Sequence, residues 1–170
     1  MKGRRHMLNT NADSKPGAKE TNNADAVKAL VDVVTKAMTT DNIDDMVNCF
    51  AADSEWVIMA TGETFKGLDE IRELATRSVA ARKHTGGLGI KPFNVFTAAA
   101  GTRLCWEYLH TGVVGEKWPS TSAQRPAPGT KFELPIILMC EIRQGKLIKI
   151  REYFDLVTLT DPGTKHKLYS

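Results

Sequence analysis

The sequence predicts an α+β fold in which helices pack on one side of a mostly antiparallel, strongly curved sheet. Three observations predict it. Two segments with helical periodicity open the domain, at about residues 23–38 and 43–50. A strand, a short strand and a third helix follow between residues 54 and 83. The chain then changes to four long strand-like segments, at about 90–99, 103–111, 131–143 and 146–156.

The composition is that of an ordinary soluble chain with one domain. Of its 170 residues, 42% are hydrophobic and 25% are charged, which is enough to bury a single core. Residues 1–22 are polar and lack the apolar segment of a signal peptide. The pair His6-Met7 is typical of a cloning junction, so residues 1–6 carry no weight as native sequence. We therefore assign 1–22 as a polar N-terminal tail and 23–170 as one domain.

Charge and cysteine content exclude several classes of partner. The formal net charge of +3 is small and includes Lys2, Arg4 and Arg5 of the tail, so nothing indicates nucleic acid binding. No apolar run is long enough to span a bilayer, so we expect no membrane partner. The three cysteines are odd in number and lack metal-type spacing, which predicts a reduced, cytoplasmic compartment.

Apolar residues at helix-face spacing define the three helices. The first two are separated by Thr40-Asp41-Asn42, which supplies a break and a new cap, and Gly86 and Gly87 end the third. The apolar stripes are Val27, Leu30, Val31, Val34 and Met38, then Ile43, Met46, Val47 and Phe50, then Ile71, Leu74, Ala75 and Val79.

The last strand places a carboxylate on its apolar side. With the period of two that a strand imposes, Glu152 shares a face with Ile148, Ile150 and Phe154, while Leu147 and the charged residues take the other face. A buried carboxylate is costly unless it is neutralised, paired or beside water in a cavity. Its apolar neighbours should raise the pKa of Glu152, and His110 is the one plausible cation with which it could pair.

Two neighbouring strands present matching apolar faces. Arg143–Gly145 predicts a three-residue hairpin loop with Gly145 in the left-handed conformation, which pairs Ile142 with Lys146 and therefore Glu152 with Ile136. We expect the inner faces of all three strands to point into one cavity. The two partner faces are Phe132, Leu134, Ile136, Leu138, Cys140 and Ile142 on one strand, and Leu104, Trp106, Tyr108 and His110 on the other.

The helix-helix-strand opening, the segment "FKGLDEIREL" and the ending "GKLIKIREYFDL" resemble the nuclear transport factor two-like superfamily. The likeness is greatest to its SnoaL-like polyketide cyclase and limonene epoxide hydrolase branches. It covers about residues 24–158, and the ending is its most specific part. The resemblance implies a conical α+β barrel around a deep apolar pocket, often in homodimers, in which polar residues on the inner strand faces determine the chemistry.

The epoxide hydrolase pattern carries over only in part. Its second acid falls on Glu152, but its arginine falls on Tyr108 and its first aspartate on His110. The tyrosine and asparagine that hold the water in that family fall on Trp56 and Ile58. The cyclases use an inward histidine beside an aspartate. His110 suits the first role, and Glu152 would have to take the second from a different strand.

We therefore predict His110, Glu152 and Tyr108 as catalytic residues, with Tyr108 donating a hydrogen bond to a developing oxyanion. Each has a structural alternative: a strand-end histidine bonded to a loop carbonyl, a carboxylate in a buried network, and a core tyrosine whose hydroxyl is satisfied. The sequence has no glycine-rich phosphate loop and no His/Cys ligand cluster, so we expect no cofactor and no metal. The predicted substrate pocket consists of Trp56, Ile58, Trp106, Leu134, Ile136, Leu138, Ile150 and Phe154.

The segment Gly112–Gly129 is long for a strand connection and carries Trp118 and Arg125. Since it begins two residues after His110, we expect a lid or a subunit contact at the pocket mouth, with a solvated loop as the alternative.

These expectations describe a homodimeric pocket protein for a small hydrophobic, cyclic molecule. As an enzyme it would carry out metal-free acid/base chemistry, such as isomerisation, aldol-type cyclisation or dehydration, of the polyketide cyclase or ketosteroid isomerase kind. The alternative is a non-catalytic module that binds a ligand or a protein partner on the same fold, and epoxide hydrolysis is less favoured.

Overall fold

Three helices and six strands make up the computed structural model, which describes residues 18–81, 89–117 and 127–155. The helices are α1 (Ala18–Thr39), α2 (Ile43–Val47) and α3 (Gly67–Ala81), and a short 3-10 turn covers Ala99–Gly101. The strands are β1 (Phe50–Ile58), β2 (Thr64–Lys66), β3 (Gly89–Ala98), β4 (Arg103–Val113), β5 (Lys131–Arg143) and β6 (Lys146–Phe154). The element order predicted from periodicity is therefore confirmed. α1 begins earlier than its apolar stripe, at Ala18.

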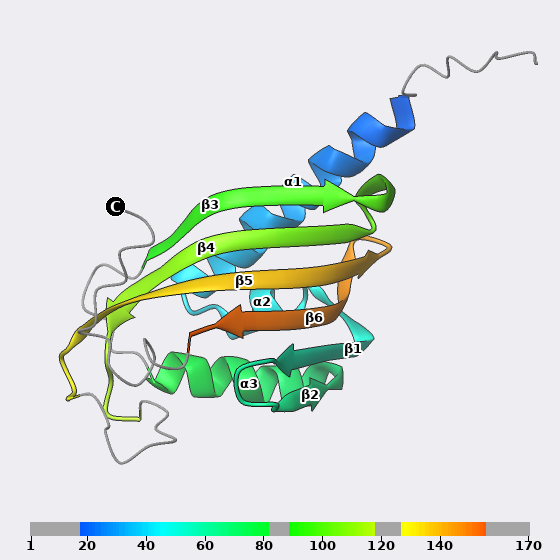
Figure 1. Cartoon of the computed structure of the whole chain (residues 1–170). Coiled ribbons are helices and arrows are strands. Elements are labelled where there is room, and N and C mark those ends of the chain that lie inside the picture. The colour runs from blue at the N-terminus through cyan, green and yellow to red at the C-terminus, as the bar shows by residue number, and fades with distance from the viewer. Residues whose placement is uncertain (1–17, 82–88, 118–126, 156–170) are drawn as a thin grey trace, which may run out of the picture.

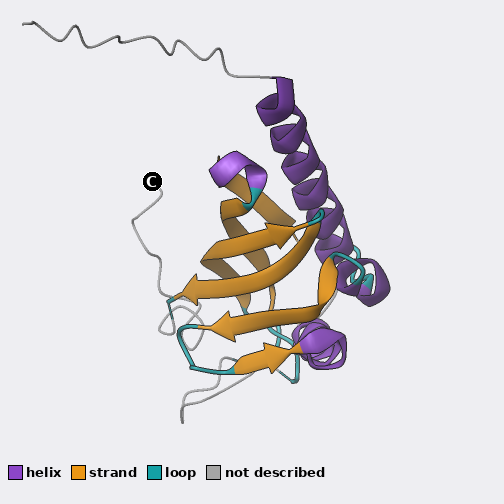
Figure 2. Cartoon of the chain, turned by 90° about the vertical axis from the view of Figure 1, so that its right-hand side faces the viewer, coloured by secondary structure: helices purple, strands orange, loops and turns teal. Residues whose placement is uncertain are grey.

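The strands form one sheet in the order β2-β1-β6-β5-β4-β3 (Figure 1). All neighbours are antiparallel except β1 and β6, which run parallel. Figure 2 shows the helices gathered on one side of this sheet. Among the described residues the sheet is not closed, because β2 and β3 each pair with one other strand. The barrel that the resemblance implies is therefore wrong in this respect, and the fold is an open, curved sheet covered by helices.

The β5–β6 hairpin differs from its predicted register. Gln144 and Gly145 both have positive φ, 51° and 72°, which makes a two-residue loop of the type favoured in hairpins. Arg143 therefore pairs with Lys146, and an irregularity follows at Ile148. Beyond it Glu152 pairs with Leu138, not with Ile136 as predicted.

The irregularity also changes which residues face inward at the start of β6. Leu147 is buried, whereas Ile148 is half-buried, so the predicted inward face is wrong at these two positions. One extra residue in a strand shifts the alternation by one, and after Ile148 the alternation agrees with the prediction again. Ile150 is fully buried as a result, and Glu152 lies on the helix-covered side of the sheet.

The core lies between the sheet and the helices. α1 contacts β3, and α3 contacts β1 and β2, with α2 between the two longer helices. None of the helices within the described residues has the length and apolar character needed to cross a membrane. The buried side chains include Val27, Val31 and Val34 of α1, Ile71 and Leu74 of α3, Trp106 and Tyr108 of β4, and Ile150 of β6.

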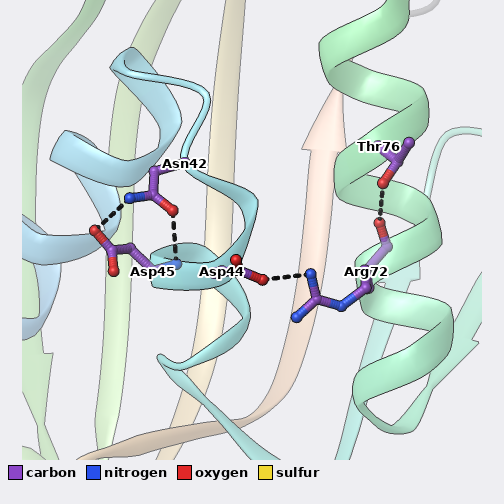
Figure 3. A network of polar contacts seen from close by, with 5 residues as sticks. All are labelled: Asn42, Asp44, Asp45, Arg72 and Thr76. Atoms are coloured by element: carbon purple, nitrogen blue, oxygen red, sulfur yellow. Dashed lines mark hydrogen bonds and ion pairs between the residues drawn. The ribbon is translucent and has the colours of Figure 1, made fainter.

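A polar network fixes α2 against α3 (Figure 3). Asn42 caps α2: its side-chain oxygen accepts from the Asp45 backbone N–H at 3.0 Å, and its amide donates to the Asp45 carboxylate at 2.7 Å. Asp44 forms an ion pair with Arg72 of α3 at 2.6 Å. The predicted cap at Thr40-Asp41-Asn42 is therefore confirmed at Asn42. These contacts set the position of two helices that border the cavity described next.

Candidate functional site

A cavity of about 650 Å³ lies between one end of the sheet and the helices. Residues from the end of α1, from α2 and from α3 form one wall, and the inner faces of β1, β4, β5 and β6 form the other. Most of its lining is apolar, which is typical of sites for small organic ligands. The apolar side chains on the sheet wall are Trp56, Ile58, Leu134, Ile136 and Phe154, and those on the helix wall include Met38, Ile43, Met46 and Leu74.

Glu152 lies in this wall and accepts a hydrogen bond from the side chain of Trp56. The indole nitrogen of Trp56 is 2.9 Å from the Oε2 atom of Glu152. The contact is possible because β1 and β6 are adjacent and parallel, with Trp56 opposite Ile150 and Ile58 opposite Glu152. Glu152 and Trp56 are therefore diagonal neighbours on the same face of the sheet.

Burial raises the pKa of Glu152 from its ordinary value of 4.5 to about 7, and the hydrogen bond from Trp56 acts in the opposite direction. Removal from water disfavours the carboxylate, whereas a donor to the carboxylate favours it. The expected rise in this pKa is thus seen, and its main cause is the expected one. A carboxyl group with a pKa near neutrality can both take up and release a proton at ordinary pH.

The possible ion pair between Glu152 and His110 does not form. His110 pairs with Leu134 on β5, whereas Glu152 pairs with Leu138 on the same strand. Four residues along a strand and two strand spacings separate them, which is roughly 16 Å between Cα atoms in a flat sheet. No charge on His110 is among the causes of the raised pKa of Glu152. Strand alternation assigns each residue a face of the sheet but not a position along the strand, so it could not decide whether the two residues meet.

His110 and Tyr108 nevertheless lie on the wall of the same cavity as Glu152. Tyr108 is fully buried, and its ring lies 4.7 Å from that of Trp106. His110 is half-buried near the end of β4, with its ring edge-on to Phe132 at 5.4 Å. A ligand in the cavity could therefore contact all three predicted catalytic residues, with Glu152 and His110 at different points along it.

Three residues predicted for the pocket lie elsewhere. Trp106, Leu138 and Ile150 line a separate void of about 10 Å³ in the core, beneath α1. The cavity occupies only one end of the inner face, whereas the prediction assigned the whole face to it. Trp56 lines both spaces and so stands between them. The other five predicted wall residues, Trp56, Ile58, Leu134, Ile136 and Phe154, line the cavity.

The rim of the cavity carries charged residues that the sequence analysis did not select. Arg77 of α3 forms an ion pair with Glu63 at 3.0 Å and lies over the ring of Phe65, and both charged residues line the cavity. Lys117, at the start of the long connection, also lines it. Arg77 and Ser78 follow Leu74 at helical spacing, which is the signal that could have placed α3 at the rim.

The connection 112–129 is described only at its two ends. Val114 is fully buried, and its backbone exchanges hydrogen bonds with Gly129 and Thr130. The Gly115 N–H donates to the Ala81 carbonyl at the end of α3 at 2.8 Å. The base of the connection therefore lies against α3, with Lys117 at the cavity. Trp118, Arg125 and the other residues of 118–126 lie outside the described residues, so the lid and subunit-contact prediction is not tested there.

Sequence reasoning missed the role of Trp56 as a hydrogen-bond donor. Parity placed it correctly as an inward residue, but the parallel pairing of β1 with β6 is not readable from either strand alone. Elsewhere in the described part of the chain, no group of three or more His, Cys, Asp and Glu side chains is arranged to hold a metal ion. The chemistry that the site offers through its own side chains is proton transfer at Glu152 in a largely apolar cavity.

Comparison with solved structures shows many chains of the same fold. A candidate polyketide cyclase from Pseudomonas putida KT2440 matches with a TM-score of 0.68 at 17% identity, over 80% of this chain and 96% of that one. TerC, crystallised with polyporic acid, matches with a TM-score of 0.63 at 17% identity, over 81% and 97% of the chains. A protein with a ketosteroid isomerase-like fold from Catenulispora acidiphila DSM 44928, in complex with trimethylamine, matches with a TM-score of 0.63 at 20% identity, over 78% and 90%.

No curated protein matches the sequence. The structural matches share the fold, and at these identities they do not transfer an activity. Residues 27–150, however, match the SnoaL-like domain family, which is most of the chain. The predicted resemblance is thereby confirmed, and the chain belongs to the SnoaL-like domain family.

Proposed function

We propose that this protein binds a small, hydrophobic, cyclic molecule in the cavity and transfers a proton on it through Glu152. The observation that carries the proposal is a carboxyl group with a pKa of about 7 in the wall of a 650 Å³ cavity. Structural roles for a carboxylate usually come with a cation, which lowers its pKa. Glu152 has an indole N–H as its partner instead, so a functional role explains its position better.

The proposed reaction begins at a carbon next to a carbonyl group of the ligand. The Glu152 carboxylate takes the proton, the C–H bond breaks as an O–H bond forms, and the electron pair moves to the carbonyl oxygen. Tyr108, on the same cavity wall, donates a hydrogen bond to this oxygen. Return of the proton to another atom gives an isomer. Attack of the enolate carbon on a second carbonyl group of the ligand forms a C–C bond and breaks that C=O π bond, and the resulting alkoxide takes the proton from Glu152, which gives a ring as in a cyclase.

His110 acts at a different part of the ligand from Glu152, since the two residues do not contact each other. We propose that it exchanges a proton with an oxygen of the ligand near the end of β4. The neighbours that hold polyporic acid and trimethylamine support a small-molecule site on this fold. Epoxide hydrolysis is the weakest candidate, because Trp56 and Ile58 stand where that branch has the residues that hold the water.

A non-catalytic binding module is the second candidate, and one experiment separates the two. The protein is incubated in deuterated buffer with hydrophobic cyclic ketones, and exchange of the hydrogens next to the carbonyl is followed by proton NMR. We expect exchange at least tenfold above that in buffer, loss of this excess in Glu152→Gln, and its retention in Glu63→Gln. Glu63 is a matched control because it lines the rim of the same cavity and pairs with Arg77.

Binding of these ketones without exchange would favour the non-catalytic module. Absence of binding, measured by calorimetry, would contradict the proposed enzyme and would leave a module that binds another ligand or a protein partner. Exchange that survives in Glu152→Gln would assign the chemistry to another residue and overturn the proposed role of Glu152.

We also propose that the protein forms a homodimer and is located in the cytoplasm. The sheet face opposite the helices carries exposed apolar side chains, among them Phe96, at 60% exposure, and Met139. Both lie in register with Cys105, and Ile137 and Tyr153 form the next pair along the same face. An apolar face of this kind suits contact with a second copy. Measurement of the molecular mass in solution by light scattering tests whether the protein is a dimer.

A further inference from the structure

The indole of Trp56 is held in a fixed orientation. It is only 4% exposed and stacks on the ring of Phe50, with centroids 5.7 Å apart and planes inclined by 28°. Its N–H reaches across from β1 to Oε2 of Glu152 on β6 at 2.9 Å. Within the described residues, Oε1 of the same carboxyl group makes no hydrogen bond. Since Glu152 lines the cavity, Oε1 is the oxygen that a ligand can reach.

An indole N–H is a donor and cannot accept a hydrogen bond. Oε2 must therefore remain an acceptor whether the carboxyl group is charged or neutral. A proton placed on Oε2 would compete with the indole proton for the same side of the carboxyl group. The neutral form keeps the hydrogen bond from Trp56 only when its proton is on Oε1.

We propose that Trp56 is a positioning residue that gives the two oxygens of Glu152 separate tasks. Oε2 stays bound to Trp56 in both protonation states, and Oε1 alone carries, releases and accepts the proton that faces the cavity. The use of this proton in a reaction rests on the proposed function. Its location on Oε1 does not, because it follows from the hydrogen bond and from the chemistry of indole.

Other ionisable groups lie near Glu152 or on the wall of the same cavity and could contribute to its pH dependence. On the strands, Cys140 of β5 lies close enough for the charge of Glu152 to help raise the pKa of its thiol to about 12, chiefly through burial. That thiol is therefore neutral over the range in which Glu152 titrates. The ionisable groups on the cavity wall itself are Tyr108 and His110 of β4, with Asp41, Glu63, Arg77 and Lys117 at the rim and helix wall.

The first test uses the unaltered protein. It contains three tryptophans, Trp56, Trp106 and Trp118, so three indole N–H signals are expected in a nitrogen-proton NMR spectrum. The signal of Trp56 should move with a midpoint near pH 7, as Glu152 titrates. It should stay downfield at both ends of the titration because the hydrogen bond persists. In Glu152→Gln the movement should disappear, while the amide oxygen of Gln keeps the N–H hydrogen-bonded.

Two results of this titration would overturn the proposal. One is a Trp56 signal that does not respond near pH 7. The other is a signal that moves to the position of a free indole at low pH, because that would mean the proton resides on Oε2.

The second test compares two buried tryptophans. Trp106 is 2% exposed, and its N–H makes no hydrogen bond within the described residues, whereas the N–H of Trp56 binds Glu152. Trp56→Phe and Trp106→Phe therefore remove the same group from the same core, and only the first removes a partner of Glu152. The pKa of Glu152 is measured by an NMR titration of protein in which the side-chain carboxyl carbons of glutamate are labelled. We expect Trp56→Phe to raise this pKa further and Trp106→Phe to leave it unchanged.

An equal effect of the two substitutions, or no effect of Trp56→Phe, would contradict the positioning role. If Trp56→Phe does not fold, the titration of the unaltered protein decides alone. The rate of ketone exchange tests the proposed function separately from the positioning role. If exchange did not depend on Glu152, the proposed function would be wrong, but the titration of the Trp56 signal would stay the same. Exchange in Trp56→Phe should fall at least tenfold, with its pH midpoint shifted upward, and Trp106→Phe should keep the original midpoint.

Discussion

The inner face of the sheet has two ends that differ in how the helices cover it. We call the first the packed end, which consists of Leu104, Trp106, Leu138, Cys140 and Ile150. α1 lies against it through Leu30, Val31 and Val34, and a void of only about 10 Å³ remains. We call the second the open end, which consists of Tyr108, His110, Leu134, Ile136, Glu152 and Phe154. There the helices leave a cavity of about 650 Å³.

Both ends come from the same three strands, and both have the same alternation of inward apolar residues. The strand pattern decides which side chains point inward. The position of the helices decides whether those side chains meet protein atoms or empty space. The comparison teaches that one alternating series of inward apolar residues can supply both the core of the fold and the lining of a site. In β6, Glu152 is the one inward residue in this series that is not apolar.

The largest expected difference is in the cost of removing a side chain from each end. Ile150→Ala at the packed end should destabilise the protein by about 4 kcal/mol, because Ile150 is fully enclosed and the hole cannot collapse. Ile136→Ala at the open end should cost about 2 kcal/mol, because part of its surface already faces a cavity. Urea unfolding of both variants measures the difference. Equal losses would mean that the open end is filled by protein in solution.

The second prediction concerns the charge at the open end. The pKa of Glu152 is about 7 when folded and near 4.5 when unfolded, so the folded state holds the proton more tightly. Its contribution to stability is therefore full below pH 4.5 and is lost as the pH rises to 7. The loss is roughly 3 kcal/mol, at about 1.4 kcal/mol per pH unit of difference in pKa.

Glu152→Gln removes this titration. We expect the variant to be more stable than the parent at pH 8 and not more stable at pH 4, with the same fold. Unfolding curves at the two pH values check the sign. If the variant is instead unfolded at both, the carboxyl group anchors a structural network, and the non-catalytic interpretation gains.

The smallest expected effect is at the rim. Arg77→Ala removes the pair with Glu63, whose side chains are both more than 40% exposed, so the loss of stability should stay below about 1 kcal/mol. Arg72→Ala is a matched control on the same helix, since it removes a similar exposed pair with Asp44. Only Arg77→Ala should change the affinity for a cavity ligand. An effect of Arg72→Ala on that affinity would show that the contact between α2 and α3 also influences ligand binding at the rim.

The sequence was sufficient for most of the fold and for part of the site. Helical spacing and strand alternation predicted each of the three helices and six strands, because burial of one face repeats along an element and is visible locally. One boundary was wrong: Phe50, assigned to the second helix, begins β1 instead. The same alternation placed Tyr108, His110 and Glu152 on the inner side. The closing motif from Gly145 was the most specific part of the resemblance to the family.

The rest depended on geometry that no single segment contains. The hairpin register was wrong because Gln144 joins Gly145 in the left-handed region and Ile148 adds a residue to β6. Whether Glu152 pairs with His110 could not be decided from the sequence, because it depends on the position along the strands and not only on the face. The division of the inner face into a packed and an open end depends on where α1 lies, which the strands do not encode.

The place of β6 in the sheet has a consequence for how the chain folds. It lies between β5, its neighbour in sequence, and β1, from the start of the domain. The hydrogen bond between Trp56 and Glu152 spans 96 residues, and one between Lys146 and Asn48 spans 98. Contacts between such distant residues form late and slowly, because the entropy cost of closing a long loop comes before the contacts can stabilise it. During synthesis, β1 and β5 therefore each keep one edge unpaired until β6 has been made. A nascent chain that stops before β6 lacks the strand that joins the β2-β1 pair to β5-β4-β3, and it also lacks Glu152, so the same strand completes the sheet and brings the carboxyl group of the proposed chemistry.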